Sequence, residues 1–505
     1  MSKRKSQRAG VLAMVVVATA FAASNASASG GTPGADADSA SRALQHARAA
    51  LDPAPGAPGG PTRDVTAAMR DLALAVPDLD GRERRQAVRL LARPTDNPDP
   101  NRDTWAVPEE PPFCSAHFCV HYVASTPDAP NLADGNVNGV PDYVEAVSAA
   151  AEHSFSVQNG ALGWPAPRSD GGLGGPGGVT DIYLANVGDE KIFGYAAPDP
   201  PPAQRCARKC FSYLVLDNDF SPAEYGYPDP GIPLRVTLAH EYNHVLQFGI
   251  DAIQDGWLFE STAVWAEEKT FPDDNDYLNY LGRFAKTSVV PITDFSGGGG
   301  LRVYGLATFL HWLDGNFGPA VVLGSWLNST RTKPKDFAVA SVDRSIRERG
   351  GNGFAAEFSQ FAAASAEWRT AGGFPDAAAY PDVKRKGTLK RGQRPRRLVV
   401  DHTAYRLLNV KPSSRPRLKL RVRAERGVVS GIGLVGRDDD TGQVTRKVKV
   451  LRKGGRGSVT LRAPERFERI TAAIVNADGR VRGFDPERGD WVYSRNNAEF
   501  RASVG

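Results

Sequence analysis

Cysteine, methionine and histidine are scarce in this chain of 505 residues, which has 4 Cys, 3 Met and 8 His. Four cysteines are too few for a small scaffold held together by disulfides. Glycine and proline (52 and 37 residues) stay below the share that is typical of low-complexity chains. Hydrophobic residues make up 41% and charged residues 24%, so the composition is that of a globular protein. The length predicts two or three domains.

Long apolar runs are also absent after the N-terminus. There, the basic stretch Met1–Arg8 precedes an apolar run at Ala9–Ala23, and Ala26-Ser27-Ala28 matches an A-x-A cleavage signal. The apolar run is too short to span a bilayer, and no cysteine for lipid attachment lies near the cleavage signal. We therefore expect a signal peptide at 1–28, cleavage after Ala28, and a secreted, extracellular protein without a stable membrane anchor.

The four cysteines are expected to form two disulfides, because export places them in an oxidising compartment. Cys114 and Cys119 bracket four residues, and Cys206 and Cys210 bracket three. Neither pair has the C-x-x-C spacing of a zinc ribbon. Local pairing is the simplest of the three connectivities, and the sequence alone does not choose among them.

Residues 29–112 form the first part of the exported chain. Their beginning, up to about residue 60, is rich in Gly, Ala, Pro, Ser and Asp and is typical of a linker. A helical pattern follows at 63–93, with a break at Pro77. This part of the chain is either a pro-segment or a helical extension.

The rest of the chain divides near residue 384. Residues 113–383 mix strand patterns with helices that come mostly after residue 231, which suits an α+β domain. Residues 384–505 alternate apolar and polar side chains over short runs, which predicts an all-β sandwich domain. The expected strands are at 118–123, 179–184 and 212–216 in the first domain, and at 396–410, 418–423, 428–435, 443–451, 457–462 and 469–475 in the second.

Charge is divided unequally between these parts. Residues 384–505 hold 31 Lys and Arg against 12 Asp and Glu, a net +19, whereas residues 29–383 hold 27 against 45, a net −18. The overall charge of +5 therefore gives no reason to expect a nucleic-acid partner. The basic C-terminal domain is expected to contact an anionic surface or the acidic domain, or simply to present a solvated face.

The segment with the most chemical content is His240-Glu241-Tyr242-Asn243-His244, an H-E-x-x-H motif. Residues four apart lie on one side of a helix, so the two imidazoles can hold one Zn²⁺ while the glutamate acts as a general base. The flanking residues support a helix here, since Pro233 suits its first turn and Gly249 suits its C-terminal cap.

A catalytic zinc site needs a third protein ligand and an open position. A second helical pattern begins at Asp255-Gly256 and ends before Pro272. Within it we expect Glu260 to be the third ligand. Glu267 follows seven residues later on nearly the same face, where it either fixes the second N–H of a histidine or serves as an alternative ligand. Glu268 is expected on an exposed face.

The H-E-x-x-H motif together with Trp257-Leu258-Phe259-Glu260-Ser261-Thr262-Ala263 resembles the gluzincin proteases. Aminopeptidase N-like enzymes have a similar W-L-N-E-G-F-A segment, whose glutamate binds zinc. The resemblance implies His240, His244 and Glu260 as zinc ligands and Glu241 as the general base.

A tyrosine downstream of the glutamate ligand is also used by aminopeptidase N-like enzymes, which favours Tyr304 as an oxyanion donor. His311 is a second candidate, since it lies seven residues later on the same expected helical face.

Two features depart from the gluzincin pattern. The spacing between the second histidine and the glutamate is shorter than in aminopeptidase N or thermolysin. A G-x-M-E-N segment is missing, because the only methionines are Met1, Met14 and Met69. The layout of the whole chain is more similar to a group of secreted bacterial proteins inferred to be metalloproteases, which combine a signal peptide, a calcium loop, H-E-x-x-H and a β-rich tail.

Residues 134–145 match the calcium loop of an EF-hand. Gly139 stands where that loop turns sharply. Pro127 and Pro130 exclude a long entering helix, so we expect a lone loop that holds a structural Ca²⁺, with only an exit helix at about 141–158. The expected ligands are the carbonyl of Val140 and the side chains of Asp134, Asn136, Asn138, Asp142 and Glu145.

These patterns predict an α+β, gluzincin-like zinc metalloprotease domain followed by an all-β sandwich domain. The expected activity is that of a secreted, calcium-stabilised metalloendopeptidase, in which Glu241 takes a proton from the attacking water and passes it to the leaving amine. The peptide substrate is expected along a strand at 179–184 or at Phe193–Tyr195. The alternatives are a cell-surface or anion-binding exoprotein with a non-catalytic metal site, and a zinc hydrolase of a non-peptide bond.

Overall fold

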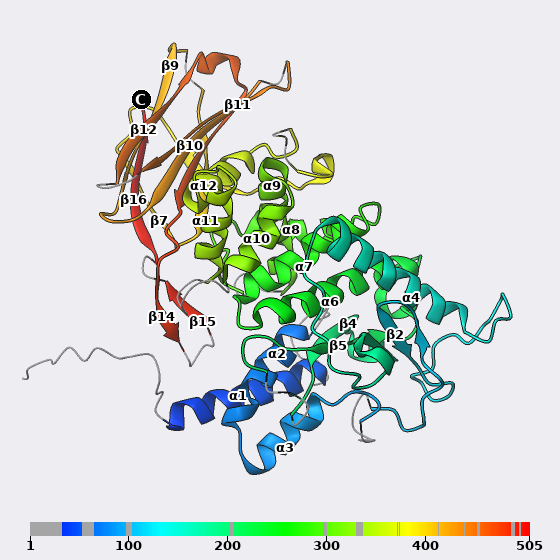
Figure 1. Cartoon of the computed structure of the whole chain (residues 1–505). Coiled ribbons are helices and arrows are strands. Elements are labelled where there is room, and N and C mark those ends of the chain that lie inside the picture. Colours follow the sequence, from blue (N-terminus) through cyan, green and yellow to red (C-terminus); the bar gives the residue numbers. More distant parts are fainter. Residues whose placement is uncertain are drawn as a thin grey trace, which may run out of the picture.

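The computed structural model shows a helical and mixed-sheet lobe joined to a β-sandwich (Figure 1). The expected signal peptide at 1–28 lies outside the residues that the structure describes. Among the described residues, no helix is both long and apolar enough to cross a bilayer. The structure describes residues 33–52, 65–96, 104–201, 204, 206–295, 300–329, 337–370, 372, 374–412, 414–438, 440–451, 455–485, 490–493 and 496–505.

A mixed sheet with the order β1-β2-β3-β5-β4 underlies the first lobe. Its central strands are parallel, while the two edge strands run antiparallel to their neighbours. The central strands are buried and largely apolar, as expected for strands covered on both faces. The three strands predicted in this region are confirmed. The strands are β1 (Phe113–Cys114), β2 (Phe118–His121), β3 (Thr180–Ala185), β4 (Gly194–Pro198) and β5 (Ser212–Asp217).

Two long helices next to this sheet carry the H-E-x-x-H motif and Glu260. Helix α6 (Gly231–Asp251) packs on β4 and β5, and α7 (Gly256–Thr270) packs beside it. The predicted C-terminal cap at Gly249 is wrong, because α6 continues for two more residues to Asp251. The carboxylate of Asp251 is buried and pairs with Arg208 at 2.9 Å, which holds this last turn in place.

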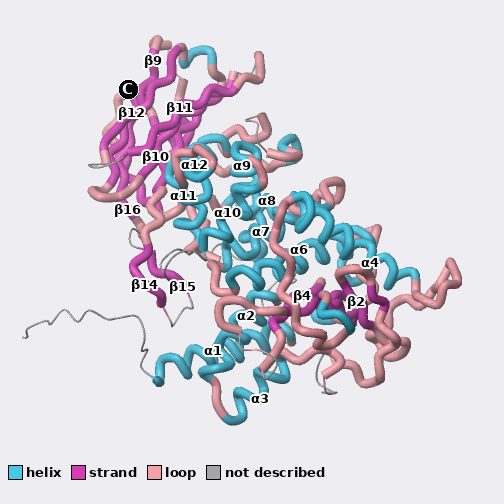
Figure 2. Tube along the Cα trace, in the orientation of Figure 1, coloured by secondary structure: helices cyan, strands magenta, loops and turns pink. Residues whose placement is uncertain are grey.

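Further helices fill the space between the sheet and the sandwich (Figure 2). Helix α12 carries Phe358 and Phe361, which contact Tyr405 of the sandwich and so join the two parts. The prediction that helices follow residue 231 is confirmed. They are α8 (Leu278–Lys286), α9 (Ala307–Phe317), α10 (Ala320–Ser329), α11 (Ala338–Glu348) and α12 (Phe354–Ala364).

The N-terminal part is more ordered than its composition suggests. The linker predicted at 29–60 is wrong for Pro33–Leu51, which is helix α1. Small residues conceal an amphipathic pattern there, because one residue in every three or four is buried: Ala40, Leu44, Ala47 and Leu51. The helical pattern at 63–93 is confirmed as α2 (Thr66–Ala75) and α3 (Gly81–Leu90), which are separated by a 3₁₀ turn that contains Pro77.

The C-terminal part is a β-sandwich, as predicted. One sheet has the order β11-β10-β13-β8-β6 and the other β12-β9-β16-β7, with an apolar core between them. The pattern at 396–410 is interrupted, since Thr403 (φ +45°) lies between two strands. The sandwich strands are β6 (Arg385–Leu389), β7 (Arg396–Val400), β8 (Ala404–Val410), β9 (Arg417–Ala424), β10 (Ser430–Arg437), β11 (Val444–Leu451), β12 (Arg456–Arg462), β13 (Arg469–Asn476) and β16 (Ala498–Val504).

Both cysteine pairs are local. Cys114 is bonded to Cys119 across the β1–β2 hairpin, and Cys206 is bonded to Cys210 in the loop before β5. Of the three connectivities that the sequence allowed, the structure contains the simplest. Two disulfides are compatible with an extracellular location.

Candidate metal centre

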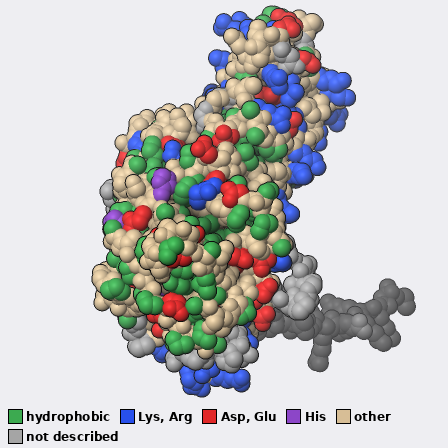
Figure 3. Space-filling model, turned by 90° about the vertical axis from the view of Figure 1, so that its right-hand side faces the viewer, with side chains coloured by type: hydrophobic (Ala, Val, Ile, Leu, Met, Phe, Trp, Pro, Cys, Tyr) green, Lys and Arg blue, Asp and Glu red, His purple; other side chains and the backbone are tan. Residues whose placement is uncertain are grey.

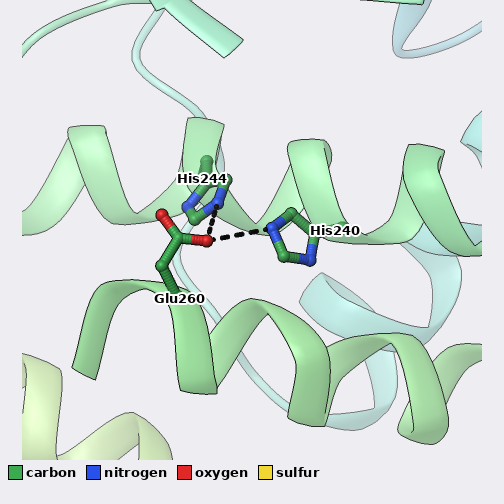
Figure 4. Close-up of side chains that lie close together, drawn as sticks. All are labelled: His240, His244 and Glu260. Carbon is green, nitrogen blue, oxygen red and sulfur yellow. Dashed lines mark ion pairs between the residues drawn. The ribbon is translucent and has the colours of Figure 1, made fainter. Parts of the chain in front are cut away.

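Three ligand-type side chains from two adjacent helices converge at one point (Figure 4). His240 and His244 project from α6, and Glu260 projects from the facing side of α7. The Oε2 atom of Glu260 lies 3.3 Å from Nε2 of His240 and 3.5 Å from Nε2 of His244. The structure therefore brings together the three residues that were predicted to bind zinc.

This geometry fits a tetrahedral metal ion. Two ligand atoms at about 2.1 Å from such an ion lie about 3.4 Å from each other, close to the two observed distances. Both carboxylate oxygens of Glu260 and the Nε2 atom of His244 are buried without a hydrogen-bond partner among the described residues. Since buried polar atoms are almost always satisfied, a bound cation would account for them.

The other nitrogen of each imidazole is fixed by a neighbour. Glu267 Oε1 lies 2.6 Å from Nδ1 of His240, and Gln247 Oε1 lies 2.8 Å from Nδ1 of His244. Each ring is thereby held with Nε2 toward Glu260, which is how ligand histidines are usually oriented. Of the two roles that the sequence left open for Glu267, the structure supports the positioning role.

The predicted general base, Glu241, faces the N-terminal part of the chain. Its Oε2 accepts a hydrogen bond of 2.7 Å from the hydroxyl of Thr66 on α2. The whole centre is closed, because the exposed fractions are 1% for His240, 1% for Glu241, 0% for His244 and 2% for Glu260.

The structure separates the two candidate oxyanion donors. Tyr304 lies in a 3₁₀ segment (Gly300–Leu306), and its ring centre is 5.5 Å from that of His240. His311 lies in α9, so the expectation of one shared helical face is wrong. Its ring contacts Tyr277, and burial followed by the charge of Lys269 lowers the pKa of His311 to about 3. No ring contact or hydrogen bond among the described residues joins His311 to the metal centre.

Glu268 is not on an exposed face, contrary to the prediction. It is 7% exposed, and burial together with nearby Asp376 raises the pKa of Glu268 to about 8. Its environment differs from that of Glu267 because the two side chains leave α7 in different directions.

The loop at 134–145 adopts a compact turn. Asp134 accepts the backbone N–H groups of Asn138 and Gly139 at 3.2 and 2.8 Å, and Gly139 has φ +89°. The side chains of Asn136 and Asn138 lie 2.9 and 2.7 Å from the two oxygens of Glu145. These contacts are made by the amide nitrogens of the two asparagines, which donate to the carboxylate of Glu145, so they hold the turn together without involving the predicted asparagine oxygens.

The remaining predicted residues of this loop also lie in the turn. Asp142 accepts the N–H of Gly135 at 3.1 Å, and Val140 donates its own N–H to Asn138 at 2.9 Å. The exit helix is confirmed as α4 (Asp142–Phe155).

A second acidic group, formed by Asp217, Asp219 and Glu224, lies after β5. The carboxylate of Asp217 accepts backbone N–H groups from Gly188, Asp219 and Phe220 at 2.7 to 3.2 Å. These three bonds explain why Asp217 is buried: its carboxylate holds the backbone of the surrounding loops in place.

A buried ionic network ties the N-terminal part to the sheet. Arg93 bonds Asp170, Asp181 and Asp199 at 2.6 to 2.9 Å, with all four side chains at most 6% exposed. His121 lies between Asp181 (3.0 Å) and Glu109 (2.8 Å). Burial disfavours the charged imidazole, but the two carboxylates outweigh burial and raise the pKa of His121.

Strand β4 is the sheet edge nearest to the metal centre. Its backbone pairs with β5 on one side only, and it packs on α6. By contrast, β3 is flanked by β2 and β5, so the prediction that 179–184 could receive a peptide is wrong. The other predicted location, Phe193–Tyr195, overlaps the beginning of β4.

Two residues of the centre were not predicted. Gln247 lies three positions after His244 on the same helix, so the helical repeat could have indicated it. Thr66 is 175 positions from Glu241, and no local pattern indicates that contact.

No protein-family model matches this chain. No curated protein matches it either. Its function therefore has to be argued from the site itself.

Proposed function

We propose that the chain is a secreted zinc-dependent metalloendopeptidase. The observation that carries this proposal is the convergence of His240, His244 and Glu260, with Glu241 on the same helical turn as the histidines. A zinc ion bound there would supply Lewis acidity, which activates water and polarises a carbonyl.

The chain's own residues have separate tasks in this proposal. Glu241 accepts the proton of the attacking water and delivers it to the leaving amine. Tyr304, whose ring packs against that of His240, would donate a hydrogen bond to the developing oxyanion. Glu267 and Gln247 hold the two imidazoles in a fixed orientation.

The ligand set favours catalysis over a purely structural metal. Structural zinc is bound by four protein groups, whereas catalytic zinc has three and an open position. Within the described residues, the group around His240 comprises three ligands. This observation weighs against the exoprotein with a non-catalytic metal site. The bond that is hydrolysed is proposed from the resemblance to gluzincins.

Calcium and export complete the proposal. Ca²⁺ is assigned to the loop at 134–145 from its match to the EF-hand pattern, and the compact turn with Gly139 at φ +89° supports this assignment. Secretion is proposed from the N-terminal signal pattern, and the two disulfides are compatible with it.

The test is metal analysis combined with cleavage of casein or of a fluorogenic peptide, with and without limited proteolysis of the mature protein. We expect one zinc ion per chain and chelator-sensitive cleavage. Glu241→Gln should keep zinc and lose cleavage, and His244→Ala should lose both. His117→Gln is a matched control, since that imidazole pairs with Glu152 and stacks on Phe155, both in α4. Stoichiometric zinc without cleavage under any of these conditions would favour the exoprotein.

A further inference from the structure

We propose that helices α1 and α2 form an inhibitor built into the chain, which covers the metal centre until it is displaced. This inference rests on the proposed function and assigns a role to the N-terminal part. Helix α2 lies over the end of the centre that carries Glu241, as the bond from Thr66 shows. In Figure 1, α2 lies beside β4, and α1 packs against α2.

The hydroxyl of Thr66 engages two groups that hydrolysis requires. It donates to Oε2 of Glu241 at 2.7 Å and accepts the backbone N–H of Ala196 in β4 at 2.9 Å. The first group is the proposed general base, and the second lies on the outer edge of the edge strand. A peptide that adds to this edge needs such N–H groups for its own carbonyls. One side chain therefore occupies both the proposed base and an N–H group of the edge strand.

The neighbouring residues of α2 seal the same region. Met69 is 0% exposed and Thr66 is 0% exposed. Arg70 donates to the carbonyl of Gln254 at 3.2 Å and lies 4.9 Å above the ring of Phe259. Phe259 in turn stacks on His244, with ring centres 4.3 Å apart. Because a substrate must reach the metal, this cover has to move before catalysis.

The ionic network limits how much of the chain can leave. Releasing Arg93 would strip three buried carboxylates of their cation, which is strongly unfavourable. The displaced part therefore ends before Arg93 and comprises α1 and α2. Between them and Arg93, α3 presents Arg82, Arg84 and Arg85 to solvent, where a trypsin-like protease can cut.

The test compares the mature wild type with Thr66→Val, Thr66→Val/Arg70→Glu and the control Thr66→Ser, which keeps the hydroxyl. The first readout is the rate at which a chelator removes zinc, and the second is the cleavage rate of a peptide. We expect both rates to rise about tenfold or more in the double variant and in wild type nicked by trypsin, with Thr66→Ser close to wild type. Hydrogen exchange of residues 66–75 checks that α2 is released while the remaining chain stays folded.

The two readouts separate this inference from the proposed function. Faster zinc removal without peptide cleavage would support the cover and contradict the protease. Cleavage by intact wild type, with rates that neither the double variant nor trypsin changes, would overturn the cover and leave the protease standing.

A different observation carries a second inference: the four-stranded sheet presents a basic outer face. Directly paired positions place four arginines in one row across β12, β9, β16 and β7. The row contains Arg456, Arg423, Arg501 and Arg397, and four further cations lie on the same face at Arg417, Lys419, Arg421 and Arg462.

This face is exposed and poorly neutralised. Glu499 pairs with Arg397 and Arg501 at 2.8 and 3.0 Å, whereas Arg421 and Arg423 have no acidic partner among the described residues. Like charges at directly opposed positions destabilise a sheet. A row of like charges that lowers the stability of the sheet is explained if the face binds an anionic partner.

The basic face points away from the acidic lobe, since the other sheet of the sandwich is the one that packs on α12. Figure 3 shows basic side chains gathered over the sandwich at the top of the view. A hollow of about 470 Å³ on this face is lined by Lys419, Arg421, Arg423, Arg456 and Arg501. Neighbouring strands lie about 4.8 Å apart, so the row matches a linear polymer with closely repeated anionic groups. We infer that this face binds such a polyanion.

The test is binding of the mature protein to long-chain inorganic polyphosphate at increasing salt. We expect Arg421→Glu/Arg423→Glu to weaken binding about tenfold or more at low salt and to flatten the salt dependence. The control Arg84→Glu/Arg85→Glu has the same change of charge on α3 and should bind like wild type. Equal binding by both variants would overturn the inference, and binding to anionic vesicles but not to polyphosphate would indicate a membrane surface instead.

Discussion

Glu267 lies 2.6 Å from the Nδ1 atom of His240, on the side of the ring that faces away from Glu260. This contact distinguishes Glu267 from Glu260, which lies seven residues earlier on nearly the same face of α7. Glu260 points toward the Nε2 atoms of His240 and His244, whereas Glu267 contacts Nδ1 on the opposite side of the His240 ring. The division of roles leads to the first prediction.

Glu267→Ala should weaken zinc binding about 10- to 100-fold, because His240 loses the group that orients its ring. Glu260→Ala should weaken zinc binding further, since it removes a ligand. The measurement is competition with a zinc-sensitive dye at neutral pH. If the two variants bind zinc equally well, the assignment of a positioning role to Glu267 is wrong.

Calcium should stabilise the protein through Glu145, whose carboxylate gathers the amides of the loop at 134–145. At a calcium concentration 100-fold above Kd, a single site adds about 2.7 kcal/mol to the free energy of unfolding. Glu145→Ala should abolish the increase of Tm with calcium in a thermal melt.

A control for this prediction lies on the same helix. Glu152→Ala removes the hydrogen bonds from Ser115 and His117 but leaves the loop intact. It should lower Tm in both conditions and keep the response to calcium. Should the wild type show no response to calcium, the loop is a metal-free turn.

Arg93 and Arg347 provide a matched pair for the ionic network. Arg93 is buried among three carboxylates, whereas Arg347 pairs with Asp343 on an exposed helix face with 52% of its side chain accessible. Arg93→Ala should cost about 3–5 kcal/mol, because it leaves buried charges without a counterion. Arg347→Ala should cost less than about 1 kcal/mol. Urea unfolding measures both values, and a small effect of Arg93→Ala would show that the carboxylates are readily hydrated or protonated.

Local spacing accounts for the part of the site that could be predicted. His240, Glu241 and His244 lie within one helical turn, and Glu260 follows on the next helix, so their convergence needs only two helices that pack together. Much of the β-sandwich was also predictable, because apolar and polar residues alternate along strands such as β9 and β16.

The rest of the site depends on contacts that are distant in sequence. Thr66 reaches Glu241 only because α2 packs against β4, and no spacing rule connects the two residues. Helix α1 was missed because alanine and other small residues hide its buried face in a composition that is also typical of linkers. The resemblance indicated Tyr304, whose ring lies beside His240, but it did not indicate the 3₁₀ backbone of this segment.

His121 should make the free energy of unfolding depend on pH at values above 6.5, the usual pKa of a histidine. Its folded-state pKa is raised above 6.5 by Asp181 and Glu109, despite the opposing effect of burial. A raised folded-state pKa contributes stability that is fully present below pH 6.5 and is lost as pH rises through the folded-state value. Wild type should therefore become less stable to urea as pH rises above 6.5. Glu109→Gln, which removes the more exposed partner, should lessen this decline, and His121→Gln should remove it. A decline of equal size in all three proteins would mean that other groups titrate in this range and that His121 is already neutral.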